Sequence, residues 1–362
     1  MAILKAPMPH QRGFSLVELM VAVTIGLVIL AAVSGIFVTS KTTYNTQDNL
    51  ARLQENARFA VYYLSDDIRR AGYAGCLESI TTVKNHLVNE LAFNFNAKVP
   101  IEGMDNNAAG NWYPSNTVLT PANLRAGTDA ITMRAALPST LSITQYMPPT
   151  SAELNVTAMG NLAIGDIIMV SNCTSADIIQ ITQTQVASLK IQHAPGGSGA
   201  SGGNKTPHEL LVGYGPGPPP AQLMVFTSRT YYVQNRANTD GTTTPVLVRQ
   251  DNGGAVQEMI EGVENMQILY GIDTEAAPDG TPNVYLRAHE VSPLVINDVN
   301  GVPVNPWTRV RAIRIGLIVR TLGNNEQDID NSALTLLGEN NGIPGDRNQR
   351  RIFTFSVNAR NL

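Results

Sequence analysis

The sequence is poor in the residues from which metal and catalytic centres are usually built. It has two cysteines, which cannot alone supply the four ligands of a structural zinc site, and no H-E-x-x-H pattern. No histidine is paired with another at metal-ligand spacing, so we expect surface or loop histidines and neither a metal nor a cofactor. The five histidines are His10, His86, His193, His208 and His289.

Charge is also scarce, at 15% of 362 residues, and no long run of one sign occurs. The 25 basic and 29 acidic residues give a formal net charge of −4, which argues against nucleic-acid binding through a basic face. Aromatic residues make up 6%, whereas glycine (30) and proline (21) are plentiful. This balance is typical of a β protein with many turns.

One short segment matches the sequence pattern of a nucleophile motif of enzymes but lacks its expected structural context. Residues 199–203 (GASGG) match G-x-S-x-G, which in enzymes needs a strand before it and a helix after it. Here the match lies in glycine- and serine-rich sequence, so we interpret it as a chance match. We therefore expect a protein that is not an enzyme.

Long apolar sequence is confined to the N-terminal region. Residues 14–38 (FSLVELMVAVTIGLVILAAVSGIFV) contain one charge and are long enough to span a bilayer as a helix. Lys5 and Arg12 precede them, which favours a cytoplasmic N-terminus and export of the rest. A cleaved secretory signal would have a shorter apolar region. A simple anchor leaves Glu18 unexplained, because a carboxylate in an apolar span needs a partner.

Residues 13–19 (GFSLVEL) resemble the processing site of type IV prepilins. The resemblance implies that residues 1–13 are a leader and that a prepilin peptidase cuts after Gly13. It also implies methylation of the new amine of Phe14. In that family the glutamate at the place of Glu18 pairs with the N-terminal amine of a neighbouring subunit, which would provide the partner that the carboxylate needs.

The helix is expected to continue over residues 39–72 as an amphipathic half. Gly72 suits a C-terminal cap, and the two preceding arginines suit the helix end. Gly26 and Gly35 replace the helix-bending proline of many pilins and are expected to loosen the membrane half. The apolar stripe comprises Leu50, Leu53, Ala57, Ala60, Val61, Leu64, Ile68 and Ala71.

Residues 73–362 are expected to form a periplasmic head rich in antiparallel β-sheet, giving an α+β, pilin-like fold. In residues 309–321, Ile313, Ile315 and Leu317 share one face, and in 350–360 the buried face holds Phe353 and Phe355. Predicted strands cover residues 129–137, 152–159, 165–172, 176–194, 222–236, 244–251, 264–273, 309–321 and 350–360.

Two stretches of the head have no clear pattern. Residues 195–221 are rich in glycine, serine and proline and are predicted to form an exposed loop. Such a loop is compatible with a linker between two subdomains or with a long hairpin insertion. Residues 85–128 are irregular and are left unassigned.

Several later blocks resemble the PilW family of minor type IV pilins, which are large relatives of the J-type pseudopilin of type II secretion. The blocks are RRAGYAGC, SNC, EGVENMQILYGID, VRAIRIGLIVRT and RRIFTFSVNARNL. The resemblance implies that Cys76 and Cys173 form a disulfide in the periplasm. From the residues alone, the two cysteines are equally compatible with buried thiols in a reducing compartment.

Two acidic loops are candidate calcium sites. Asp328 with Asp330, and Asp298 with Asn300, offer oxygen ligands, but neither loop has the full EF-hand pattern. A solvated turn is the simpler interpretation of each.

The sequence therefore predicts a minor pilin anchored in the bacterial inner membrane before it enters the fibre. It would assemble with other minor pilins and the major pilin, near the tip, and prime the pilus for twitching motility, adhesion or DNA uptake. A J-type pseudopilin and a module that binds or presents an adhesin at the tip are the alternatives. The sequence does not identify the neighbouring pilins.

Overall fold

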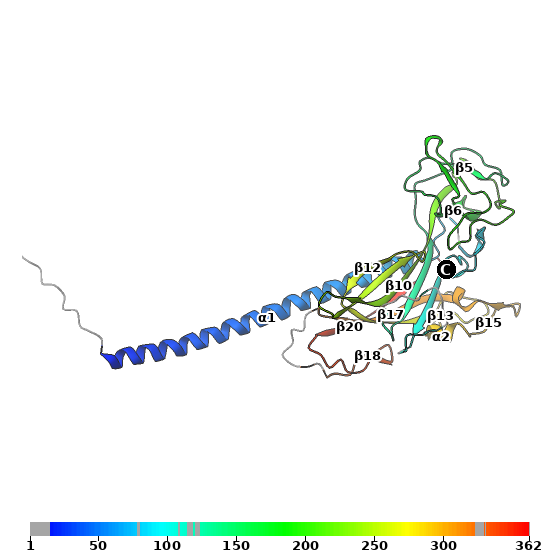
Figure 1. The fold of residues 1–362 in the computed structure, drawn as a ribbon. Coiled ribbons are helices and arrows are strands. Elements are labelled where there is room, and N and C mark those ends of the chain that lie inside the picture. The colour runs from blue at the N-terminus through cyan, green and yellow to red at the C-terminus, as the bar shows by residue number, and fades with distance from the viewer. Residues whose placement is uncertain are drawn as a thin grey trace, which may run out of the picture.

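The computed structural model describes residues 15–77, 80–107, 109–113, 119, 124–322, 329 and 331–361. A single long helix, α1 (Leu16–Arg70), projects from a head made of strands (Figure 1). Ser15 caps its N-terminus, and the helix stops at Ala71, after which Gly72 adopts a φ of 78°. This positive φ suits glycine and confirms the predicted end of the helix. The helix continues unbroken through Gly26 and Gly35, so neither glycine loosens it visibly.

The second half of α1 packs on a four-stranded antiparallel sheet. Its strands are, in spatial order, β14 (Val284–Leu286), β13 (Val263–Ile272), β17 (Val310–Arg320) and β20 (Arg350–Asn358). The buried helix residues match the predicted stripe at Leu53, Ala57, Ala60, Leu64, Ile68 and Ala71. Across from them lie Ile313, Ile315 and Leu317 of β17, which share the predicted face. This interface is the largest core of the head, and apolar burial of this kind is the main stabilising term in folding.

A nine-stranded sheet forms the rest of the framework. Its main path runs β1 (Lys84–Asn85), β7 (Ala176–Gln180), β6 (Ile167–Ser171), β10 (Gln222–Ala237), β4 (Ala130–Ala136), β2 (Ile101–Asn106) and β3 (Trp112–Tyr113). β11 (Thr243–Asp251) pairs with β10, and β12 (Val256–Glu261) pairs with β11. Among the described pairings of named strands, β1 with β7 is parallel and the others are antiparallel. The expected α+β class is confirmed.

β10 joins two parts of the head. Its residues 222–225 pair with β6, and residues 229–237 pair with β11. We call residues 138–221 the upper lobe, which holds β6, β7, β5 (Glu153–Asn155), β8 (Gln183–Gln185) and β9 (Lys190–Gln192) at the top of Figure 1. Because one 16-residue strand enters both parts, the two parts share a sheet and are not independent domains joined by a flexible linker.

Shorter elements complete the head. Two-residue hairpins are formed by β15 (Ile296–Asn297) with β16 (Pro303–Val304) and by β18 (Thr335–Leu336) with β19 (Glu339–Asn340). The short helices are η1 (Ile80–Thr82), η2 (Val186–Ser188), α2 (Ala288–Val291) and η3 (Pro306–Arg309).

The predicted exposed loop at residues 195–221 is wrong in part. Leu210 and Tyr214 are buried in the core of the upper lobe, and Asn204 is buried where its side chain accepts the backbone N–H of Gln180. Glycine and serine allow the chain to turn repeatedly, while the few large residues between them supply the anchors. The segment covers the upper lobe and does not link two subdomains.

One predicted strand is divided. Residues 176–194 form β7, β8 and β9, with the short helix η2 and a left-handed residue, Leu189, between the last two. Among the strands of six residues or more, two were not predicted: β2, in the unassigned stretch 85–128, and β12, at residues 256–261. Both lie in polar sequence, where alternation of apolar side chains is weak. The strands of two or three residues that were also not predicted are β1, β3, β14, β15, β16, β18 and β19.

Candidate functional site: the stalk helix and the head it carries

We call α1 the stalk helix. Its first half exposes apolar side chains to solvent. Leu16, Ile36 and Phe37 are 75%, 68% and 69% exposed, and other large apolar residues between them are similarly open. Within the described part of the chain, α1 is the one helix that is long and apolar enough to cross a membrane. So large an apolar surface requires lipid or other apolar helices around it.

Glu18 lies in the first turn of this surface. Its Oε2 accepts the backbone N–H of Ser15 at 2.9 Å, and the Glu18 N–H donates to Ser15 Oγ at 3.2 Å. This reciprocal capping box fixes the carboxylate at the end of the helix. The capping bonds leave the negative charge uncompensated, and in an apolar environment that charge needs a cation. Gly13 and Phe14 lie outside the described residues.

The other end of α1 is tied to the head through Asp67. This residue is 6% exposed, and its two carboxylate oxygens accept hydrogen bonds from Arg229 Nη1 at 2.6 Å and from the Tyr231 hydroxyl at 2.7 Å. Both partners belong to β10. Burial, with the negative charge of Asp67, raises the pKa of Tyr231 above its usual value. Asp67, Arg229 and Tyr231 therefore form a polar cluster inside an apolar interface, and we call this cluster the clamp.

The C-terminal residues close the same junction. Asn361 Nδ2 donates to the carbonyl oxygens of Arg69 and Ala71, at 3.1 and 3.3 Å. These carbonyls lie at the end of α1, where helix carbonyls lack helical partners. The end of the chain therefore caps the stalk helix.

A disulfide joins the end of the stalk to the upper lobe. Cys76 and Cys173 are bonded, with their Cα atoms 4.8 Å apart. Cys173 has a φ of 70° in the turn between β6 and β7, where the Asn172 side chain accepts the backbone N–H of Ser175. The bond therefore connects the turn after α1 directly to that hairpin.

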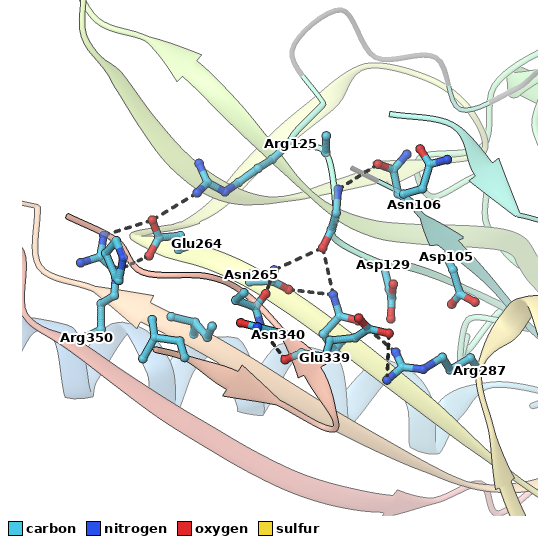
Figure 2. A pocket seen from close by; sticks show the side chains of 18 of the residues that line it. Asp105, Asn106, Arg125, Asp129, Glu264, Asn265, Arg287, Glu339, Asn340 and Arg350 are labelled. Atoms are coloured by element: carbon cyan, nitrogen blue, oxygen red, sulfur yellow. Dashed lines mark hydrogen bonds and ion pairs between the residues drawn. The ribbon is translucent and has the colours of Figure 1, made fainter. Parts of the chain in front are cut away.

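A cavity of about 870 Å³ opens in the part of the head built on β13 (Figure 2). Side chains reach it from the end of β2, residues 125–129, β13 and residues 334–350. Carboxylates, arginines and side-chain amides line most of it, and Tyr113 adds an aromatic ring. Sequence reasoning missed this site because its residues come from segments that each resemble ordinary polar loops.

The described geometry does not support calcium binding at the candidate loop that contains Asp298. The Asp298 side chain accepts backbone N–H groups of Asn300 and Val302, which is the arrangement of a closed turn. Asp328 and Asp330 lie outside the described residues. Three other carboxylates, those of Asp273, Glu275 and Asp279, do offer ligand oxygens within 4.8 Å of one another. The Asp273 oxygens already accept N–H groups of Glu275 and Gly280.

Two of the histidines, His86 and His193, lie outside helices and strands, as the expectation of surface or loop positions allows, but both are buried. His86 Nε2 lies 2.6 Å from Asp177 Oδ1, whose other oxygen accepts the Tyr214 hydroxyl. His193 is 1% exposed, and its ring nitrogens have no hydrogen-bond partner among the described residues. His208 stacks edge-on against it, with ring centroids 6.1 Å apart. Histidines 86, 193 and 208 come from separate segments, so no sequence spacing could have revealed the group.

This cluster predicts an acid-sensitive head. Burial, reinforced by the nearby His208 and His86, lowers the pKa of His193 to about 4. Unfolded His193 takes up a proton below about pH 6.5, whereas the folded protein does not until about pH 4. The free energy of unfolding should therefore fall by about 3 kcal/mol in total as the pH drops through this window. Urea unfolding of the full chain in detergent at pH 7 and pH 4.5 measures it.

The variant His193→Phe should lose that part of the acid sensitivity, because phenylalanine fills the apolar site without titrating. Carboxylates titrate equally in both proteins, so the difference between the two pH profiles isolates His193. Identical pH profiles for the two proteins would show that another group is responsible.

Two family models match the chain. The model described as the prokaryotic N-terminal methylation motif matches residues 8–34, and the model of the type IV pilus-assembly protein W matches residues 230–361. Together the two matches support a PilW-family minor pilin. No curated protein and no solved structure matches it.

The PilW match begins inside β10 and includes β11, β12, β13, β17 and β20. It therefore covers the sheet on which the stalk helix packs. Three of the resembling blocks lie within it, whereas RRAGYAGC and SNC, which contain the disulfide cysteines, lie outside. The upper lobe of this pilin also lies outside the matched residues, so the family match says nothing about what that lobe does.

Proposed function

We propose that this minor pilin is made as a prepilin, cut after Gly13, methylated at Phe14, and assembled through its stalk helix. Glu18 carries the proposal. It is the single charged side chain in the exposed apolar half of α1, and the capping box holds it in the first turn of this helix, four residues after Phe14 in the sequence. A neighbouring subunit's terminal amine would neutralise it between packed helices, where either charge alone is costly.

The size of the head supports a role for few copies. Residues 73–361 form a bulky head on one thin helix, which is difficult to repeat densely along a fibre. We propose that the head faces the periplasm before assembly and that the subunit joins other minor pilins at the pilus tip, where it primes addition of the major pilin. This role is structural and requires no catalysis.

The variant Glu18→Ala tests the assembly role. We expect processing after Gly13 to continue, because the peptidase site is intact, and incorporation into fibres to fall at least tenfold. Sheared filaments analysed by mass spectrometry for a peptide that begins at methylated Phe14 give both quantities. Asp48→Ala removes an exposed carboxylate that pairs with Arg52 on the same helix and should leave incorporation unchanged.

Full incorporation of Glu18→Ala would refute the pairing role. If the processed wild-type chain stays with the cell envelope and is absent from sheared fibres, a secretion pseudopilin or an assembly primer that remains in the periplasm becomes the better assignment. If Phe14 is never exposed, the prepilin assignment itself is wrong.

A further inference from the structure

None of the residues that line the cavity on the head belongs to α1. The cavity lies between the end of β2, residues 125–129, β13 and residues 334–350, and Figure 2 shows the labelled side chains facing one another across it. Its volume of about 870 Å³ is in the range of small-molecule sites, which is roughly 300–1,000 Å³.

The charges that line the cavity are balanced in pairs. Glu264 bridges Arg125 and Arg350, at 3.1 and 2.6 Å, and Arg287 pairs with Glu339 at 3.2 Å. Arg350 also pairs with Asp346. Because all three arginines already contact carboxylates, an anionic ligand would have to break ion pairs to bind. Arg287 also lies beside the carboxylates that a metal ion would need, as Figure 2 shows.

One carboxyl group of the cavity lining, that of Asp129, is almost completely buried. Asp129 is 3% exposed, and its Oδ2 accepts the backbone N–H of Ile268 at 2.7 Å. Burial, reinforced by the negative charge of Asp105, raises the pKa of Asp129 well above its usual range. This shift favours the protonated form, which offers an O–H as well as an acceptor oxygen.

Side-chain amides supply most of the remaining polar atoms. Asn106 is 6% exposed, and its Oδ1 accepts the N–H of Gly127, while its Nδ2 is buried with no partner among the described residues. A buried donor left without a partner is costly, which favours a ligand or water that accepts from it. Gln267 and Asn265 extend the row of amides along β13.

An aromatic ring completes the lining. Tyr113 is 48% exposed and lies on β3, in register with Asp105 of β2. An exposed ring beside a polar wall suits a ligand with one apolar face and a rim of hydroxyls.

We propose that this cavity binds a neutral saccharide. Hydroxyl groups donate and accept at once, so they match a wall of paired charges, side-chain amides and the buried carboxyl group of Asp129. The apolar face of a sugar ring would lie on Tyr113. Such a site would let the head recognise a glycan, which is independent of how the stalk assembles. The glycan could come from a surface that the fibre meets or from the N-acetylated glycan of the cell wall, and both present the same chemistry.

The test uses the full chain in a zwitterionic detergent without a sugar headgroup, because maltoside and glucoside detergents would compete. Saturation-transfer NMR and calorimetry would be run with lactose, as a surface-type glycan, and chitobiose, as a cell-wall-type glycan. Sialyllactose and an acidic peptide serve as charged probes. We expect one neutral disaccharide to bind and the charged probes to bind at least tenfold more weakly; the stronger of lactose and chitobiose indicates the source.

The variant Tyr113→Ala should weaken that binding about tenfold. Tyr146→Ala is the matched control, because Tyr146 is 66% exposed in the upper lobe and does not line the cavity. Asp129→Asn keeps a donor and an acceptor in the same shape and should retain binding, whereas Asp129→Leu should abolish it.

The proposal is overturned if neither disaccharide binds, if the charged probes bind as well, or if Tyr113→Ala binds like Tyr146→Ala. Thermal unfolding of each variant separates lost binding from lost folding. Incorporation of Tyr113→Ala into fibres should match wild type, so failure of this site and failure of the assembly role give different results.

Discussion

Replacing Cys76 and Cys173 with serine is expected to lower the free energy of unfolding of the head by about 4–5 kcal/mol. The bond spans a sequence separation of 97 residues, and a cross-link across about 100 residues removes roughly that much chain entropy from the unfolded state. It also fixes the upper lobe to the end of the stalk. Urea unfolding of the full chain in detergent, for the variant and for wild type, measures the difference.

Wild type under a reducing agent provides the control. It should unfold at nearly the same urea concentration as the serine variant, because both proteins lack the bond and differ only by a thiol or a hydroxyl at the two positions. A variant within 0.5 kcal/mol of the oxidised protein would mean that strand pairing through β10 alone holds the upper lobe in place.

The variant Asp67→Ala is expected to cost about 3 kcal/mol or more. Truncation removes both hydrogen bonds of the clamp, leaves the Tyr231 hydroxyl without that acceptor, and leaves Arg229 with only the more distant carboxylate of Asp251, at 3.9 Å. Breaking a buried ion pair on one side is costly because the remaining charge is uncompensated. Urea unfolding of the full chain measures the loss, which should appear as a lower midpoint with an unchanged slope.

Asp66→Ala is the matched control for this variant. Asp66 is the adjacent residue, but its side chain is 37% exposed and pairs with Arg70 on the surface of α1. Exposed helix pairs of this kind contribute about 0.5 kcal/mol or less. Equal losses for the two variants would show that the buried clamp contributes no more than a surface pair.

Much of this fold could be predicted from periodicity. The helix stripe from Leu53 to Ala71 and the alternation in residues 309–321 each bury one face against the same core, so the pattern is strong in both. The missed strand β2 is different. Gly103 fits against Tyr270, where an added Cβ would lie 2.0 Å from the tyrosine hydroxyl oxygen, so glycine is required there and the alternation is interrupted.

Polar sites were less predictable because each depends on contacts between distant segments. Glu18 was conspicuous as a lone charge in apolar sequence. Asp67 lies on the buried face of α1, and that position was the one available signal; its partners on β10 are about 160 residues away. Asp129 and Asn106 resemble turn residues in the sequence. Their role in the cavity is visible only in the fold, where Asp129 accepts the N–H of Ile268 in β13 and Asn106 accepts the N–H of Gly127.

The position of the disulfide has a mechanical consequence. If a subunit in a fibre is pulled through α1, tension leaves the helix at Ala71 and reaches Cys76 within five residues. From there a covalent bond passes it to the turn between β6 and β7, so the chain between the two cysteines is bypassed and is not stretched. Strands β2 and β4 lie in that bypassed stretch, and β2 contributes Asp105 and Asn106 to the cavity, so this wall of the cavity would keep its shape under tension.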